Sequence, residues 1–326
     1  MIGAKRCIKR CPICGSGKVI CYGTTALKKQ RFQCLDCTRT YVWKENYNRV
    51  ARHQYWFKLW VGENYSIRQL CKLSGYSAFK LNSIKNYWLE RTPEDEFDYS
   101  QIRYIVYDAT YFHKDGCLLN LMNTQNQKII AHLYVNSESY REAYPWLAGL
   151  KHKGLSPKCI TTDGDLSIIR AMKRVWPEVQ LQRCLYHIQH EGCRWLRSYP
   201  KTEAGKVLRV LLSSLSRIRT VQERNSFIQG YTEWLAQYGD FVLGLPRTTV
   251  AFKDLQRTIV LINNALPDMF HYLENPAVHK TTNALEGFHS RLKSDYQRHR
   301  GLTKHHRIHY IHWYCYLKNR AIYQHK

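Results

Sequence analysis

The sequence predicts a multidomain α/β protein in which two small N-terminal domains precede a larger α/β domain. Three observations lead to this prediction. Residues 1–48 contain two CxxC pairs among Gly and Lys residues, residues 49–92 have a helical pattern, and residues 100–200 alternate β-like and helical runs. A chain of 326 residues with 44% hydrophobic content is long enough for two or three domains with real cores.

The charge of the chain favours nucleic acid as its partner. Lys and Arg number 50 against 25 Asp and Glu, which gives a formal net charge of +25. The excess is concentrated in residues 1–60, which contain 13 Lys and Arg and two acids. A polyanion would offset the repulsion within such a chain. Solubility or loose adhesion to a membrane surface is the plainer alternative.

The chain has no obvious signal for a membrane or for secretion. No run approaches 18 consecutive apolar residues, and the first residues, MIGAKRCIKRCPIC, contain no apolar segment typical of a signal peptide. We therefore expect a cytoplasmic protein associated with the nucleoid. In that reducing environment cysteines bind metal or remain buried thiols.

Four of the twelve cysteines have the spacing of a zinc site. They form two CxxC pairs separated by 19 residues: Cys11 with Cys14, and Cys34 with Cys37. Four thiolates at about 2.3 Å form a closed structural Zn²⁺ site, which stabilises a module too small to fold around its own core. Cys7 and Cys21 lie close enough to compete as ligands but belong to no CxxC pair. We predict a zinc ribbon with one ion; four buried or redox-active thiols are the alternative.

Residues 49–92 have the pattern of a helix-turn-helix domain. Ser66 is a suitable N-cap, and Ser74-Gly75 interrupts the helical pattern. On the second helix, from about Ala78, four apolar residues are expected to pack inward: Phe79, Leu81, Ile84 and Trp88. The opposite face is polar and cationic and is predicted to read DNA through Lys80, Asn82, Ser83, Lys85 and Asn86. An ordinary amphipathic helix with a solvated face is the alternative.

The polar segment RTPEDEFDYS, residues 91–100, marks a boundary before the larger domain. Three β-like runs then precede an alternation of helix and strand, which predicts a mixed sheet in residues 100–200. Residues 201–278 have helical patterns with no strand between them, so we expect an all-α insertion. Residues 279–326 complete the α/β domain and end in a basic C-terminal helix.

Three acids are candidates for a site that binds two divalent cations. Asp108 follows the apolar run RYIVY and Asp163 follows KCITT, so each is expected near the end of a strand. Glu286 lies in the helical segment TTNALEGFHSRLK. Mg²⁺ and Mn²⁺ prefer oxygen ligands, and two ions about 4 Å apart activate an attacking oxygen and stabilise a leaving one. However, Asp163 is followed by Gly164 and Asp165, which is also the pattern of an ordinary turn.

Four motifs in order along the chain resemble those of bacterial Mutator-family DDE transposases of insertion sequences. These motifs are VYDATYF, TTDGDLSIIRAM, QRCLYHI and TTNALEGFHSRLK. The resemblance covers roughly residues 100–320, and some of these transposases also have a zinc ribbon and helix-turn-helix in front. It implies an RNase H-like catalytic domain in which Asp108, Asp163 and Glu286 hold two Mg²⁺ ions. An α-helical insertion would account for the 123 positions between Asp163 and Glu286.

The resemblance extends to residues around these acids. Cys184 and His187 match the family's CxxH signature, and we expect them to position the site or contact a metal; a buried structural pair is the alternative. Asn283 precedes Glu286 as in the family pattern. Basic residues that follow are candidates for contacts with DNA phosphates, or for a solvated face: His289, Arg291, Lys293, Arg298 and Arg300.

The implied function is DNA transposition. Water attack at the end of the element would free a 3′-OH, which would attack target DNA. The expected partners are double-stranded DNA, as terminal inverted repeats and target, and a second copy of the chain, since two ends must be brought together. A DNA-binding regulator without catalysis and an RNase H-like nuclease that does not join strands are the alternatives. Trp195 and Trp234 are expected either to pack in a core or to stack on a displaced base.

Overall fold

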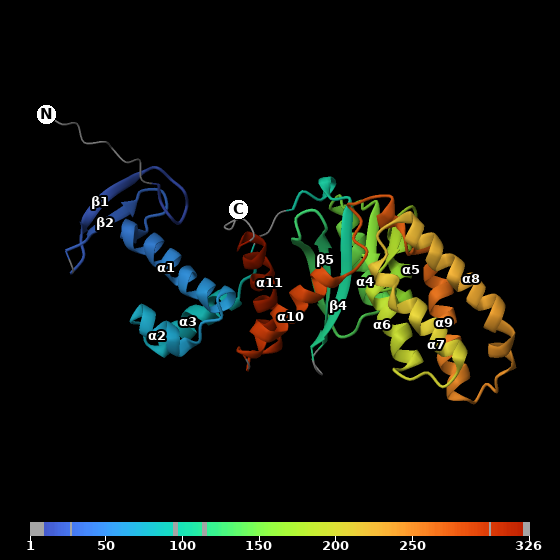
Figure 1. Cartoon of the computed structure of the whole chain (residues 1–326). Coiled ribbons are helices and arrows are strands. Elements are labelled where there is room, and N and C mark those ends of the chain that lie inside the picture. The colour runs from blue at the N-terminus through green and yellow to red at the C-terminus, as the bar shows by residue number, and fades with distance from the viewer. Residues whose placement is uncertain (1–9, 27, 94–96, 113–115, 300, 322–326) are drawn as a thin grey trace. The chain divides into compact units, whose positions relative to one another are not determined.

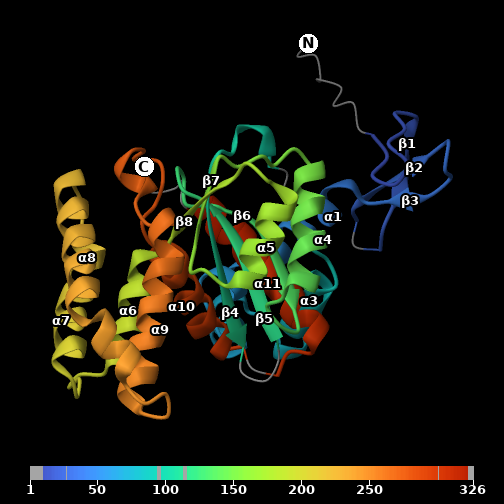
Figure 2. The same cartoon turned by 90° about the vertical axis from the view of Figure 1, so that its right-hand side faces the viewer.

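The computed structural model describes residues 10–26, 28–93, 97–112, 116–299 and 301–321 (Figures 1 and 2). The chain divides into two compact units: unit 1 comprises residues 1–92 and 303–317, and unit 2 comprises residues 93–302 and 318–326. The predicted mixed α/β class is confirmed. The grouping of residues 303–317 with the first 92 residues differs from the domain limits predicted along the chain.

Unit 1 begins with a small antiparallel sheet. Its strands are β1 (Val19–Thr24), β2 (Gln30–Cys34) and β3 (Thr40–Tyr41), in that order. Phe32 of β2 pairs with Tyr41 of β3, and the two rings stack with centroids 6.2 Å apart. Among the residues that the structure describes, the buried core of this sheet consists of these two residues with Cys11 and Cys34. Such a core is too small to hold the module together without a further crosslink.

Three helices follow the small sheet, and their caps lie where the sequence predicted them. They are α1 (Trp43–Gly62), α2 (Ile67–Ser74) and α3 (Ala78–Leu89). The Ser66 side chain accepts from the N–H of Gln69, whose own side chain accepts from the N–H of Ser66, so a complete capping box starts α2. Gly75 ends α2 with φ 71°, a left-handed conformation that glycine adopts without strain. The predicted N-cap and break are therefore confirmed.

The packing of α3 differs from the prediction at one residue. Leu81 and Ile84 are buried and Trp88 is half-buried, as expected. Phe79, however, is 85% exposed, so the prediction that it packs inward is wrong. It occupies the second position of α3, where the described part of unit 1 places no layer over the helix face.

The last helix, α11 (Lys304–Ala321), supplies aromatic residues to the core of unit 1. Trp313 meets Phe57 of α1 edge-on with ring centroids 5.2 Å apart, and Trp88 of α3 at 5.7 Å. Its Nε1 donates to the carbonyl oxygens of Trp88 and Arg91 at 3.1 and 2.8 Å. Tyr310 lies against Trp60 in the same way, with centroids 5.6 Å apart. Residues from the two ends of the chain therefore share one core.

Unit 2 is built on a mixed five-stranded sheet. The strands are β4 (Tyr104–Phe112), β5 (Gly116–Asn123), β6 (Ile129–Val135), β7 (Cys159–Thr162) and β8 (Gln180–Arg183). Their spatial order is β6-β5-β4-β7-β8. The pairs β6-β5 and β5-β4 are antiparallel, whereas β4-β7 and β7-β8 are parallel. A mixed sheet was the expectation for this part of the chain.

Helices cover both faces of this sheet (Figures 1 and 2). On one face α4 (Tyr140–His152) and α5 (Leu166–Val175) bury residues such as Leu147 and Met172 against Ile105 and Tyr107 of β4. On the other face α10 (Asn283–Gln297) lies along β4. Because side chains alternate along a strand, Asp108 faces α10 whereas Tyr107 faces α4 and α5.

The remaining helices form a second hydrophobic core in unit 2. They are α6 (Leu185–Leu196), α7 (Glu203–Ser213), α8 (Val221–Gly244) and α9 (Val250–Ala265), with short 3₁₀ turns at Tyr99–Gln101, Leu215–Arg217, Leu266–Asp268 and His271–Leu273. Trp234 is buried in this core and its Nε1 donates to the carbonyl oxygen of Ala204, which fits core packing rather than base stacking. Trp195 is half-buried beneath the Arg257 guanidinium, 5.6 Å from the ring centroid. In the described ranges, no helix has the length and apolar character that crossing a membrane requires.

Candidate functional site

Asp108 and Asp163 occupy equivalent positions on neighbouring parallel strands. Val106 of β4 pairs with Thr161 of β7, and each Asp stands two residues beyond this pair. Asp108 is 6% exposed. Burial raises the pKa of Asp108; the hydrogen bond with His289 opposes the shift, and the charge of Asp163 adds to it. Two carboxylates that repel each other at this depth suit a divalent cation.

His289 of α10 holds Asp108 in place. Its Nδ1 lies 3.1 Å from Oδ2 of Asp108, and its Nε2 lies 2.7 Å from Nδ2 of Asn120, the cross-strand neighbour of Asp108 on β5. Because an amide Nδ2 only donates, Nε2 of His289 accepts from Asn120, and Nδ1 is the nitrogen that donates to the Asp108 carboxylate. His289 is 4% exposed, so its buried position differs from the surface position predicted for it.

The turn after β7 contains two aspartates with different contacts: Asp165 caps a helix, and Asp163 is a candidate metal ligand. Oδ1 of Asp165 accepts from two backbone N–H groups in the first turn of α5, at 2.8 and 3.1 Å. Asp163 is therefore not the residue that caps the helix, although its Oδ1 accepts from the N–H of Asp165 at 3.3 Å. Gly164 has φ 104°, and a Cβ there would lie 2.0 Å from the Arg183 guanidinium. The turn itself thus requires glycine.

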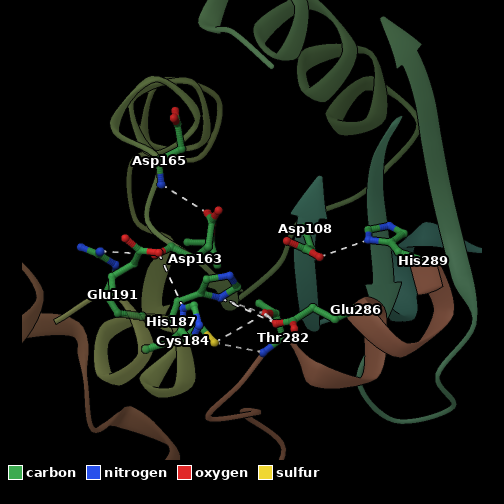
Figure 3. Close-up of polar contacts among 12 residues, drawn as sticks. Asp108, Asp163, Asp165, Cys184, His187, Glu191, Thr282, Glu286 and His289 are labelled. Atoms are coloured by element: carbon green, nitrogen blue, oxygen red, sulfur yellow. Dashed lines mark hydrogen bonds and ion pairs between the residues drawn. The ribbon is translucent and has the colours of Figure 1, made fainter. Parts of the chain in front are cut away.

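Glu286 lies in the first turn of α10 and extends towards Cys184 and His187 (Figure 3). Oγ1 of Thr282 donates to Oε1 of Glu286 at 2.7 Å and lies 3.4 Å from both Sγ of Cys184 and Nδ1 of His187. The ligand atoms of Cys184, His187 and Glu286 all lie within 4.8 Å of one another. Among the described residues, Asp108, Asp163 and Glu286 do not form such a group. The three acids share a region of unit 2 but not one set of contacts.

Backbone contacts explain how Glu286 approaches Asp163 despite the long separation in sequence. Residues 279–282, which lead into α10, are bonded to β7 and to the start of α6. The bonds run from Thr161 Oγ1 to His279 O at 2.7 Å, from Leu185 N to Lys280 O at 3.0 Å and from Thr282 N to Cys184 Sγ at 3.4 Å. The contact with the buried Cys184 thiol therefore positions the segment that carries Glu286. Positioning of the site was one of the roles that the sequence analysis left open for Cys184.

His187 is a cation among acids. Its hydrogen bond with Cys184, together with the negative charges of Cys184, Asp163 and Glu286, raises the pKa of His187 to about 9 against the opposing effect of burial. The imidazole is therefore positively charged at neutral pH in the metal-free protein. A histidine that ligates a metal is neutral, so an ion bound there would release this proton.

Two further residues near the acids were not among the site residues predicted from the sequence. Glu138, in the loop between β6 and α4, accepts at Oε1 from the Tyr107 hydroxyl at 2.8 Å. Burial and the charges of nearby aspartates raise the pKa of Glu138 to about 7. Arg183 is 6% exposed and donates from Nη2 to the carbonyl oxygen of Asp163 at 3.3 Å. Only its place in the motif QRCLYHI pointed towards Arg183, and nothing in the sequence pointed to Glu138.

The two CxxC pairs meet in unit 1. The Sγ atoms of Cys11 and Cys37 are 3.6 Å apart, those of Cys14 and Cys34 are 3.5 Å apart, and all four lie within 4.8 Å of one another. A tetrahedron with Zn–S bonds of about 2.3 Å has sulfur atoms roughly 3.8 Å apart, so the group fits a zinc ion. Cys21 is exposed and outside this group. Cys7 lies outside the described residues.

The predicted DNA contacts differ in exposure and belong to both units. Exposed residues are Lys80, Ser83, Asn86, Arg291 and Arg298, whereas Asn82, Lys85 and Lys293 are half-buried. Nζ of Lys85 donates to Oδ1 of Asn82 at 3.0 Å and lies 5.8 Å from the Trp60 ring centroid. Burial lowers the pKa of Lys85. These two side chains are thus engaged within unit 1, and Arg300 lies outside the described residues.

One family model matches the part of the chain that contains most of this site. Residues 104–191 match the model described as the MULE transposase domain. The match includes Asp108, Asp163, Cys184 and His187 and ends before Glu286. It supports a Mutator-like transposase domain in this region, and with it a transposase function for the chain.

Comparisons with whole proteins give no further support for a function. No curated protein matches the chain. Among solved structures, one match is a chain of the simian T-cell lymphotropic virus intasome in complex with the PP2A regulatory subunit B56 gamma, with 14% identity and a TM-score of 0.22. It covers 51% of this chain and 70% of that chain, and at this TM-score the likeness supports no conclusion about function.

Proposed function

We propose that the protein is a DNA transposase that cleaves the ends of a mobile element and joins the freed 3′-OH to target DNA. The observation that carries the proposal is the register of β4 and β7. Asp108 and Asp163 each stand two residues beyond the Val106–Thr161 pair, Asp163 just after the end of β7, and both lie within the region that matches a transposase domain. Paired carboxylates at one level of a sheet suit metal-dependent transfer of a phosphoryl group.

The proposal includes the fold of each part. An RNase H-like domain is supported by three antiparallel strands followed by two parallel ones, with helices on both faces. The helical segment between α6 and α10 would be its insertion. In unit 1, the group of four cysteines supports a zinc ribbon that holds one Zn²⁺, and α2 with α3 supports a helix-turn-helix.

Asp108, Asp163 and Glu286 would hold two Mg²⁺ ions, or Mn²⁺ in their place. Bound ions of this kind activate the attacking oxygen and stabilise the leaving oxygen. The donor set consists of hard oxygen atoms, and burial raises the pKa of Asp108, so a bound cation would stabilise its carboxylate form. Around these ligands, His289 orients Asp108 and Thr282 holds Glu286, so the ligands depend on neighbours that fix them.

The partners would be double-stranded DNA and a second copy of the chain. The net charge of +25 suits DNA phosphates, and Lys80 on α3 and Arg291 on α10 are exposed. Two element ends must be held together for joining, so a homodimer on the terminal inverted repeats and target DNA is proposed.

A joining reaction tests this proposal. The purified protein is incubated with labelled duplex DNA from the flanks of its own gene and a plasmid target, in Mg²⁺ or EDTA. We expect Mg²⁺-dependent covalent joining that Asp163→Ala abolishes, whereas the capping-site variant Asp165→Asn retains it. Cleavage without joining would indicate a nuclease. Binding without either reaction would indicate a regulator and overturn the proposal.

A further inference from the structure

A cavity opens beside α6, next to the candidate site but outside it. It has a volume of about 460 Å³ and is lined by α6, the residues just after it and α7. The lining residues used here are Tyr186, His190, Arg194, Arg197 and Arg209. None of them is a proposed metal ligand, and the volume is in the range of ligand sites.

The charge around this cavity is positive. Its lining contains three arginines and no acid. Arg194 pairs with a glutamate one turn earlier, and Arg197 shares the carboxylate of Asp254 with Arg257. Together with Arg209, four guanidinium groups therefore face two carboxylates. The side chains of Arg194 and Arg197 remain 61% and 58% exposed, so they are accessible to the spaced charges of a phosphodiester backbone.

An aromatic platform lies where the cavity meets the candidate site. Tyr186 is 40% exposed and stacks on His190, with ring centroids 5.8 Å apart and an interplanar angle of 21°. The Tyr186 ring also meets His187 edge-on at 6.3 Å. Every nucleobase presents a flat face to such a ring, whatever its sequence.

We infer that this cavity binds a few nucleotides of single-stranded DNA, with a base on Tyr186 and phosphates on the arginines. Tyr186, His190 and Arg194 follow at intervals of four residues, so they lie on one face of α6. From Tyr186 to Arg194 this face is about 12 Å long, close to the length of three or four stacked nucleotides. Bases in a duplex are already paired and stacked, so an exposed platform selects an unpaired strand.

The inference rests on the proposed function only for the source of the strand. Tyr186 adjoins His187, which contacts Glu286, so the bound segment would be the one next to the cleaved bond. Binding of the strand itself requires neither metal nor cleavage, and it is measured apart from them.

A binding experiment on the full chain tests the inference. The probe is a 12-nucleotide DNA strand with one 2-aminopurine, in EDTA, with anisotropy for affinity and 2-aminopurine quenching for stacking. Tyr186→Ala is expected to weaken binding roughly five- to hundred-fold and to remove the quenching, whereas Tyr186→Trp retains both. Tyr199→Ala, a change at a tyrosine that is 90% exposed, is the matched control and should bind as the wild type does.

The arginines are tested through the salt dependence of binding. Arg194→Gln is expected to lower the slope of log affinity against log salt by about 0.7, the value for one phosphate contact on a single strand. Arg174→Gln removes an exposed arginine from α5 and should leave the slope unchanged. Thermal unfolding of each variant verifies that it is folded.

Two results would overturn the inference. One is equal affinity and quenching for Tyr186→Ala and Tyr199→Ala in folded protein; the other is Tyr186-dependent binding of RNA but not of DNA. If joining fails while Tyr186 is still required for strand binding, the proposed function is wrong but the strand-binding site is supported. If joining occurs without any effect of Tyr186, only the inference falls.

Discussion

Asp163 and Asp165 lie two positions apart in one turn but have different contacts. Asp165 caps α5, whereas Asp163 follows the strand next to that of Asp108, and its charge raises the pKa of Asp108. The sequence alone gave both residues the same turn pattern. The register of two parallel strands, a long-range property, distinguishes the candidate ligand from the cap.

This difference predicts opposite behaviour of two variants in thermal unfolding. Asp163→Asn should abolish stabilisation by Mg²⁺, which amounts to about 1.4 kcal/mol at ten times the dissociation constant. Asp165→Ala should cost about 1 kcal/mol through loss of the cap but keep the Mg²⁺ effect. A normal Mg²⁺ effect in Asp163→Asn would contradict its role as a ligand.

The raised pKa of Glu138 predicts a pH dependence of stability. Its folded pKa of about 7 exceeds the ordinary value of 4.5, so the folded protein holds this proton more tightly than the unfolded chain. The contribution is present below about pH 4.5 and is lost as the pH rises through 7. Urea unfolding of metal-free protein at pH 5 and pH 8 should show lower stability at pH 8. Glu138→Gln should reduce that difference, leaving the parts that Asp108 and His187 contribute in the same direction, because the pKa of each is raised in the folded protein.

At the scale of elements, local sequence signals were sufficient for starts and stops but not for packing. The Ser66 cap, the Gly75 break and the strands around Asp108 and Asp163 depend on neighbours in sequence and were predicted. Phe79 and His289 depend on what other elements cover them. The helical pattern predicted Phe79 inside, and the run of basic residues after Glu286 predicted His289 at the surface; both positions are reversed in the structure.

The small sheet of unit 1 is expected to depend on zinc. Cys34→Ala should remove the one zinc ion per chain and leave residues 10–41 open to proteolysis, because the remaining core is very small. Cys21→Ala should keep the zinc, since Cys21 lies outside the group of four thiols. Elemental analysis and limited proteolysis measure both. Retention of zinc by Cys34→Ala would contradict the predicted ligand set.

At the scale of the whole molecule, the last helix belongs with the first ninety residues. No local signal in KHHRIHYIHWYCYLKNR predicts this, because the contacts of Trp313 with Phe57 and Trp88 span more than 220 positions. The order of the strands in unit 2 could likewise not be predicted from the β-like runs in the sequence, although a mixed sheet was predicted. What the sequence supplied at this scale was the resemblance of four motifs, which pointed to the acids and to Cys184 and His187 but not to Glu138.

The shared core of unit 1 predicts a distant effect of one substitution. Trp313→Ala should cost about 3–5 kcal/mol and speed hydrogen exchange in α1 and α3, because it removes a ring and two hydrogen bonds from their core. His305→Ala, on the same helix, removes an exposed pair with Glu90 and ring contacts with two neighbouring histidines, and should cost less than about 1 kcal/mol. Unchanged exchange in α1 and α3 of Trp313→Ala would contradict the shared core.

The most direct test of the proposed site is anomalous diffraction from crystals of the full chain, bound to DNA and grown in Mn²⁺. The account predicts two peaks about 4 Å apart among the carboxylates of Asp108, Asp163 and Glu286. Their absence in Asp163→Asn crystals would verify that this residue holds the ions. A single peak held by Cys184, His187 and Glu286, with none at Asp108 and Asp163, would contradict the proposed two-metal site.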